Sequence, residues 1–199
     1  MAPIVIPFRG PSGKRRIDAP EELRAQLALA MLGDVVAAGM ATDRTLVVTQ
    51  DTEAAELARG LGAELVEDPG GGQGGAVAAG LATLPDRPVL VVNADLPCVV
   101  PHDLRALAGV ADLGAVGLVE AGDGTTNALA LPRPQVFAPL YGAGSAGRFA
   151  EHARSLRYDV APAAIPNLID DVDTREDLER LALRVGPRTQ AALGLLQAL

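Results

Sequence analysis

Short apolar segments with strand character alternate with segments of helical periodicity along the first 120 residues, and this alternation limits the folds open to the chain. The expected strands share runs of β-branched and other apolar residues, and lie at 3–8, 44–50, 63–68, 87–94 and 113–120. The expected helices lie between them, at 20–39, 52–62, 76–84 and 101–110. Strands that alternate with helices form a parallel sheet with helices on both faces. We therefore expect an α/β, Rossmann-like fold with a mostly parallel central sheet flanked by helices.

The rhythm of the sequence changes after residue 120. The expected elements there are a loop with an edge strand at 121–134, a glycine loop and helix at 141–156, a short strand at 167–173, a helix at 174–185 and a helical tail at 187–199. No internal repeat and no linker interrupts the sequence. We therefore expect one domain that covers residues 1–199.

The composition excludes several classes of function. The chain carries 25 acidic and 17 basic residues, for a net charge of −8, which makes a poor nucleic-acid surface. We expect no signal peptide and no membrane span, because no stretch of the sequence reaches the roughly 18 apolar residues that a span requires. A single cysteine, Cys98, rules out an internal disulfide framework and suits a cytoplasmic protein.

Three aspartates follow apolar segments at positions where ligands bind in α/β folds. Asp95 comes directly after an expected buried strand, and ligands of open α/β sheets bind outside the carboxyl ends of the strands. Asp171 and Asp173 stand two residues apart in an expected extended run, which places their side chains on one face, roughly 6–7 Å apart. Two carboxylates this close repel each other, and an oxygen-only cluster suits Mg²⁺.

Structural roles are open for two of these acids. Asp95 could be a turn acid that caps the helix expected near residue 101. Asp173 could cap a helix, since the sequence has capping-box spacings from Asp173 to Glu176 and from Thr174 to Asp177. Capping does not explain Asp171.

Two glycine-rich loops could themselves bind part of a nucleotide. The stretch 9–16 follows the first strand and is not a Walker A loop, because Arg15 stands where Ser or Thr should follow Lys14. Its glycines and basic residues suit a phosphate-binding loop. The alternative is a flexible basic turn that binds no ligand. The stretch 70–75 has enough glycine for a base or a phosphate to lie on the backbone, and alone it is a weak signal.

A third glycine loop, GAGS at 142–145, runs into an expected helix. Free backbone amides, the positive end of the helix dipole and the Ser145 hydroxyl form an anion site there. The alternative is that Ser145 is a plain N-cap residue.

The order of these motifs resembles one enzyme family over most of residues 3–186. The motifs are NADLP at 93–97, GTTNAL at 124–129, GAGS at 142–145 and DDVDTREDL at 170–178. In this order they resemble the 2-phospho-L-lactate and phosphoenolpyruvate guanylyltransferases of coenzyme F-420 biosynthesis, within the molybdopterin-guanylyltransferase-like nucleotidyltransferases. The resemblance implies a single-domain nucleotidyltransferase fold. It also implies transfer of GMP from GTP to a small phosphorylated three-carbon acid, with release of pyrophosphate.

The resemblance also implies roles for particular residues. Asp95, Asp171 and Asp173 would be the catalytic acids that hold Mg²⁺. The acceptor acid would be bound by Thr126, with Thr125 as the alternative, and by Gly142 and Ser145. The nucleotide would be met by Arg9, Lys14, Gly72, Gln73 and Gly74. Gln73-Gly74-Gly75 stands where the family often has Leu-Asn-Ala, which leaves the recognition of guanine open.

The same resemblance sets the expected partners. These are GTP and either phosphoenolpyruvate or 2-phospho-L-lactate, with 3-phosphoglycerate as a further acceptor, and a transferase that loads the product onto a deazaflavin precursor. A monomer or a homodimer fits the sequence. The alternatives are a nucleotidyltransferase acting on a sugar phosphate or molybdopterin, and a non-catalytic nucleotide-binding module.

Overall fold

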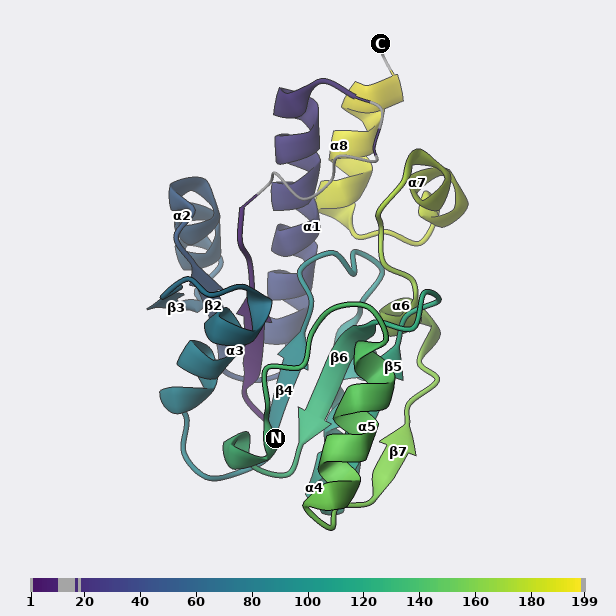
Figure 1. The fold of residues 1–199 in the computed structure, drawn as a ribbon. Coiled ribbons are helices and arrows are strands. Elements are labelled where there is room, and N and C mark those ends of the chain that lie inside the picture. The colour runs from purple at the N-terminus through teal and green to yellow at the C-terminus, as the bar shows by residue number, and fades with distance from the viewer. Residues whose placement is uncertain (1, 11–16, 18, 198–199) are drawn as a thin grey trace.

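The strands of the described residues form one seven-stranded sheet in the computed structural model, which describes residues 2–10, 17 and 19–197 (Figure 1). The order across the sheet is β3-β2-β1-β4-β6-β5-β7. The bounds are β1 Ile4–Pro7, β2 Thr45–Thr49, β3 Glu64–Glu67, β4 Val89–Val92, β5 Val116–Glu120, β6 Thr126–Leu131 and β7 Val160–Pro162. All pairings are parallel except those of β6, which runs antiparallel to β4 and β5. The predicted α/β fold with a mostly parallel sheet is confirmed.

Helices cover both faces of this sheet. Their bounds are α1 Glu21–Met40, α2 Thr52–Gly60, α3 Gln73–Ala82, α4 Pro101–Asp112, the 3-10 turn η2 Pro134–Val136, α5 Ser145–Ser155, α6 Pro166–Ile169, α7 Arg175–Leu181 and α8 Pro187–Gln197. Successive side chains of a strand point to opposite faces. In β1, Ile4 and Ile6 accordingly pack in the cluster that contains α1, α2 and α4, whereas Val5 packs with α3 and α5. Figure 1 shows α3 and α5 on the face toward the viewer.

Helix α1 is long and apolar enough, by length and composition alone, to cross a membrane. In the structure, 56% of its most apolar 18-residue window is buried inside the protein. It packs against α8, as Figure 1 shows, and its buried residues belong to two of the core clusters. This packing is that of a core helix beneath the sheet.

The expectation of an edge strand within 121–134 is wrong. Strand β6 lies inside the sheet between β4 and β5, and all six of its residues are buried. The chain turns back after β5, where the amide of Ala121 donates to the carbonyl of Thr125, and it then pairs with β4 in the register Val92 to Ala128. Because β6 is antiparallel, its first residues lie at the same edge of the sheet as the carboxyl end of β4.

The strand expected at 167–173 is also wrong. Residues 166–169 form α6, and the chain continues without regular structure to residue 173. Pro166 occupies the first helical position, where proline is favoured. Other differences are smaller: α3 begins at Gln73 rather than at 76, α7 ends at Leu181 rather than at 185, and β7 was not expected. The helical tail is confirmed over Pro187–Gln197.

Helix α3 approaches the sheet closely at Gly80, and this contact generates a prediction. A Cβ atom at Gly80 would lie 2.6 Å from Val5 Cγ1 and 2.9 Å from Val48 Cγ2. We expect Gly80→Ala to lower the free energy of unfolding by about 1–3 kcal/mol through overpacking. Urea unfolding measures the change.

Gly109 in α4 is the matched control, because a Cβ atom there would meet nothing within 4 Å. We expect Gly109→Ala to leave stability unchanged or to raise it by about 0.5–1 kcal/mol, as Ala does in helix interiors. Equal stability of Gly80→Ala and the wild type would contradict the packing argument.

Candidate functional site

The site lies where the carboxyl ends of β1 and β4 meet the start of β6. The amide of Asn93, just after β4, donates to the carbonyl of Asn127 at 3.0 Å and so extends the pairing of β4 with β6. Asp95 follows two residues later, at the point where the pairing ends. Asp95 therefore occupies the end of a central strand, as its position in the sequence predicts.

A backbone hydrogen bond brings the other two acids to Asp95. The amide of Val172 donates to the carbonyl of Asp95 at 3.2 Å. The Val172 side chain is fully buried in the core cluster that includes Leu27 and Met31 of α1. Alternation then turns Asp171 and Asp173 away from that core, so the alternation argument holds although the segment is not a strand.

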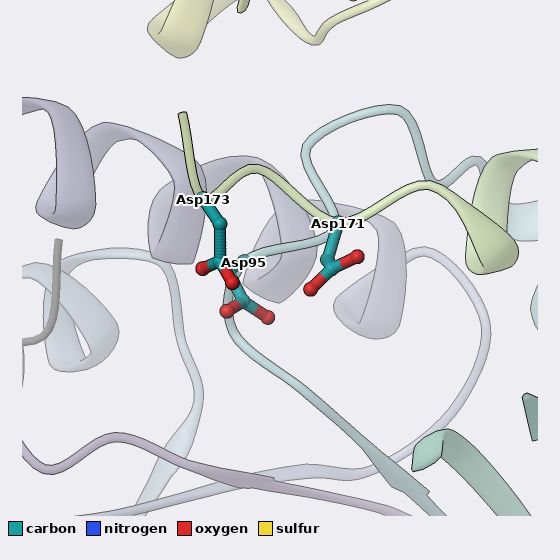
Figure 2. Close-up of side chains that lie close together, drawn as sticks. All are labelled: Asp95, Asp171 and Asp173. Atoms are coloured by element: carbon teal, nitrogen blue, oxygen red, sulfur yellow. The ribbon is translucent and has the colours of Figure 1, made fainter. Parts of the chain in front are cut away.

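The three carboxylates converge, as Figure 2 shows. One oxygen each from Asp95, Asp171 and Asp173 lies within 4.8 Å of the others, and all three residues are partly buried. An octahedral Mg²⁺ binds oxygen at about 2.0–2.1 Å, which places neighbouring ligands about 3 Å apart and opposite ligands about 4 Å apart. The donor set therefore fits a hard divalent cation after a small closure of the side chains.

The helix caps near the site are made by residues outside the acid trio. At the start of α4, the amide of Val100 donates to Asp103 Oδ2 at 3.0 Å. At the start of α7, Thr174 is the N-cap residue and forms a capping box with Asp177. The N-cap positions of α4 and α7 are thus occupied by Val100 and Thr174, not by Asp95 or Asp173.

Two adjoining pockets open at the acids, with volumes of about 280 and 230 Å³. Both are lined by Gln73, Asn93, Asp95 and Asp173. The larger is also lined by Pro7, Phe8, Arg9, Gly10, Ala28, Met31 and Ala94. The smaller is also lined by Asp123, Thr125, Thr126, Asn127, Tyr141, Gly142, Ser145 and Asp171. Two ligands, one in each pocket, would therefore meet at the carboxylates.

The residues predicted to meet the nucleotide differ in where the structure places them. Arg9 and Gln73 line the larger pocket. Gly72 is the residue before α3, with a φ of 88°, a conformation that favours glycine. Gly74 is buried, and a Cβ atom there would lie 2.5 Å from Pro139 Cβ, so its position is explained by close packing. Lys14 lies outside the described residues.

The residues predicted to bind the acceptor all line the smaller pocket. Gly142 has a φ of 111° and lies in the loop before α5. The Ser145 hydroxyl donates to Thr126 Oγ1 at 3.0 Å, and both side chains are buried. Gly144, not Ser145, is the N-cap residue of α5. The two buried hydroxyls therefore orient each other at the pocket.

Two asparagines hold the site together, and sequence analysis assigned neither a role. Asn93 accepts from Gln73 Nε2 at 2.7 Å and donates to the carbonyl of Thr126 at 3.1 Å, so it bridges the two pockets. Buried Asn127 donates to the carbonyls of Leu168 and Ile169 at the end of α6. The signal was available, because both asparagines lie within the NADLP and GTTNAL motifs.

Asp170, the neighbour of the trio, faces the opposite way. Its two oxygens accept from Arg180 Nη1 at 2.6 Å and from Arg184 Nη1 at 3.0 Å. Arg184 also donates to Asn167 Oδ1 at 2.9 Å. Burial raises the pKa of Asp170, but the two guanidinium hydrogen bonds lower it by more, so the net shift is downward. Asp170 thus stays charged and anchors one end of the segment that carries Asp171 and Asp173.

This anchor generates a prediction about metal affinity. Asp170→Asn should weaken the hydrogen bonds to both arginines and so loosen the segment that carries Asp171 and Asp173. We expect the affinity for a divalent cation to fall by roughly 3- to 10-fold, because Asp170 orients the metal ligands without being one of them. Titration with Mn²⁺ followed by electron paramagnetic resonance measures this. The control is Arg175→Gln, since Arg175 pairs with Glu179 on the exposed face of α7. Equal affinity of Asp170→Asn and the control would contradict the anchoring role.

A family model described as "Guanylyl transferase CofC like" matches residues 2–193 of the chain. The chain is 39% identical over 207 residues to the phosphoenolpyruvate guanylyltransferase of Streptomyces coelicolor, covering 97% of this chain and 96% of that protein. It is 36% identical over 204 residues to the enzyme of the same name from Geodermatophilus obscurus, covering 96% and 93%.

Solved structures share the fold. A nucleotidyl transferase from Methanothermobacter superposes with a TM-score of 0.66 at 19% identity, covering 98% of this chain and 99% of that one. A Desulfovibrio desulfuricans protein named for nucleotide-diphospho-sugar transfer superposes with a TM-score of 0.79 at 16% identity, covering 99% and 95%. At these identities the likeness concerns the fold alone.

Proposed function

This chain belongs to the CofC-like guanylyl transferase family, and from that premise we propose that it transfers GMP from GTP to phosphoenolpyruvate and releases pyrophosphate. The relatives named for this activity support the proposal, since they align over nearly the whole chain. 2-Phospho-L-lactate and 3-phosphoglycerate are the competing acceptors, because they differ from phosphoenolpyruvate by few atoms. The product would enter coenzyme F-420 biosynthesis.

The observation that carries the proposal is the meeting of two pockets at three carboxylates. A transfer between two anionic substrates needs one site for each and a centre of charge compensation between them. The larger pocket, with Arg9 and Gln73, is assigned to GTP. The smaller pocket, with Thr126, Gly142 and Ser145, is assigned to the acceptor.

Asp95, Asp171 and Asp173 would hold Mg²⁺. When bound, the ion would neutralise phosphate charge, which matters because two unit charges 4 Å apart repel by about 4 kcal/mol at an effective dielectric of 20. The backbone bond from Val172 to Asp95 and the Asp170 anchor keep the three carboxylates in place for this purpose.

The acceptor needs no general base. A phosphate monoester has its second pKa near about 6, so it is largely dianionic at pH 7 and already nucleophilic. His102 and His152 are not among the residues that line the two pockets, and His152 Nε2 instead lies 3.1 Å from the carbonyl of Val136. In-line attack of an acceptor oxygen on the α-phosphorus forms one P–O bond and breaks the bond to the leaving pyrophosphate.

The wider setting is part of the same proposal. The reaction would take place in the cytoplasm, and the product would pass to a transferase that loads a deazaflavin precursor. A monomer or a homodimer would suffice, because both pockets are lined by residues of one chain.

The test of the activity is pyrophosphate release by the purified protein with Mg²⁺. We expect release with GTP and phosphoenolpyruvate, and weaker release with the two other phosphoacids or with ATP and CTP. A parallel set should contain the deazaflavin-loading transferase, which would draw off an unstable product. Release with a sugar phosphate in place of every phosphoacid would refute the proposed acceptor class.

Asp95 provides the matching variant. We expect Asp95→Asn to lower kcat by at least about 100-fold, because a lost metal ligand removes charge compensation in the transition state. Asp112→Asn at the exposed end of α4 is the control and should retain wild-type rates. If Asp95→Asn turned over substrate at the wild-type rate, Asp95 would not be a metal ligand.

A further inference from the structure

The smaller pocket has an unusual wall for a site that receives an anion. Its lining includes four carboxylates, from Asp95, Asp123, Asp171 and Asp173. No lysine or arginine is among the described residues that line it. The described part of this lining therefore offers an anion neutral hydrogen-bond donors. A hydrogen bond from such a donor to a charged oxygen is stronger than one between two neutral groups.

Tyr141 lines this pocket, and its ring is fixed by aromatic packing. The ring lies edge-on to Phe149, with centroids 5.2 Å apart and an interplanar angle of 73°. Phe137 lies on another side, with centroids 6.2 Å apart. Such pairs favour defined ring geometries and limit the freedom of the side chain. The Tyr141 ring is therefore held in a defined orientation, in a residue that lines the pocket.

Arg148 fixes the backbone of the same loop. This arginine of α5 donates from Nε and Nη2 to the carbonyl of Leu140, at 3.2 and 2.9 Å, and from Nη2 to the carbonyl of Tyr141 at 3.2 Å. Its Nη1 also donates to the carbonyl of Ala143, so the guanidinium holds the loop at residues 140, 141 and 143. Both the ring and the main chain of Tyr141 are thus held before any ligand arrives.

The hydroxyl of Tyr141 is the part of the residue that the fold does not use. Within the described chain, no residue forms a hydrogen bond with it, whereas the phenols of partly buried tyrosines usually find a partner. Burial raises the pKa of Tyr141, so the hydroxyl keeps its proton across the physiological range. It can act there as a donor to an anionic oxygen.

We propose that the Tyr141 hydroxyl is a further acceptor-binding group, which donates a hydrogen bond to an anionic oxygen of the phosphoacid and contributes to selection of the acceptor. The proposal rests on the proposed function for the identity of the acceptor. It adds a specificity-determining residue to Thr126, Gly142 and Ser145, and it places that residue directly before the GAGS loop.

Tyr141→Phe tests the proposal, because it removes one oxygen atom and keeps the packed ring. The expected result is a KM for phosphoenolpyruvate raised by about tenfold or more, as for loss of a hydrogen bond to a charged group, with the KM for GTP changed by less than about twofold. Since the neutral phenol stays protonated, this ratio should be the same at about pH 6.5 and pH 8.5. Thermal unfolding of both proteins checks that the fold is kept.

Tyr158→Phe is the matched control. Tyr158 is also partly buried and packs against the same core cluster, but it does not line the pocket. We expect it to change both KM values by less than about twofold, within the range of a neutral surface change. If Tyr158→Phe raised the KM for phosphoenolpyruvate as much as Tyr141→Phe, the effect would come from packing and the proposal would be overturned.

Direct binding separates this inference from the proposed function. Calorimetry with Mg²⁺, phosphoenolpyruvate and a GTP analogue that cannot be cleaved between its α- and β-phosphates measures affinity without turnover. Weaker binding by Tyr141→Phe supports the inference even if the wild type releases no pyrophosphate, and only the proposed activity would then fail. Equal binding and equal KM in an active enzyme overturn the inference and leave guanylyl transfer intact. If the wild type neither binds nor converts any phosphoacid, both are overturned.

Discussion

The arrangement of the site depends on one backbone hydrogen bond, from the amide of Val172 to the carbonyl of Asp95. It joins the end of a central strand to a segment far along the chain, and it forces three carboxylates together. Their oxygens lie within 4.8 Å of one another, and at about 4–5 Å each pair of charges repels by roughly 3–4 kcal/mol at an effective dielectric of 20. Full burial of Val172, worth about 1.5–3 kcal/mol, and the arginines on Asp170 offset part of that cost.

The antiparallel strand β6 explains why two pockets share these acids. A parallel strand in its place would bring its carboxyl end, not its start, to the edge where β4 ends. The antiparallel direction of β6 instead places Thr126 and Asn127 beside Asn93. The Asn127 side chain then donates hydrogen bonds to two carbonyls at the end of α6. The acceptor side and the acid-bearing segment are therefore positioned by the same strand.

Sequence alone predicted what local pattern determines. Alternating elements determined the sheet and its covering helices, the end of an apolar strand marked Asp95, and a period of two placed Asp171 and Asp173 on one side. The place of β6 and the helix α6 were missed, because they depend on pairing with β4 and on capping by Asn127, both distant in sequence. Tyr141 was missed because an aromatic residue beside a glycine loop is usually part of the hydrophobic core, and only the structure shows that it lines the smaller pocket.

The distribution of arginines around the acid segment gives a reason for the neutral donors. An arginine in the wall of the smaller pocket would pair with the nearby carboxylates and compete for the space of a cation. Among the described residues, Arg180 and Arg184 bind Asp170, the neighbour of the trio, and Arg148 binds backbone carbonyls. Hydroxyl groups bind an anion without forming ion pairs with the acids. They add no positive charge beside the acid trio while the same pocket receives a phosphoacid.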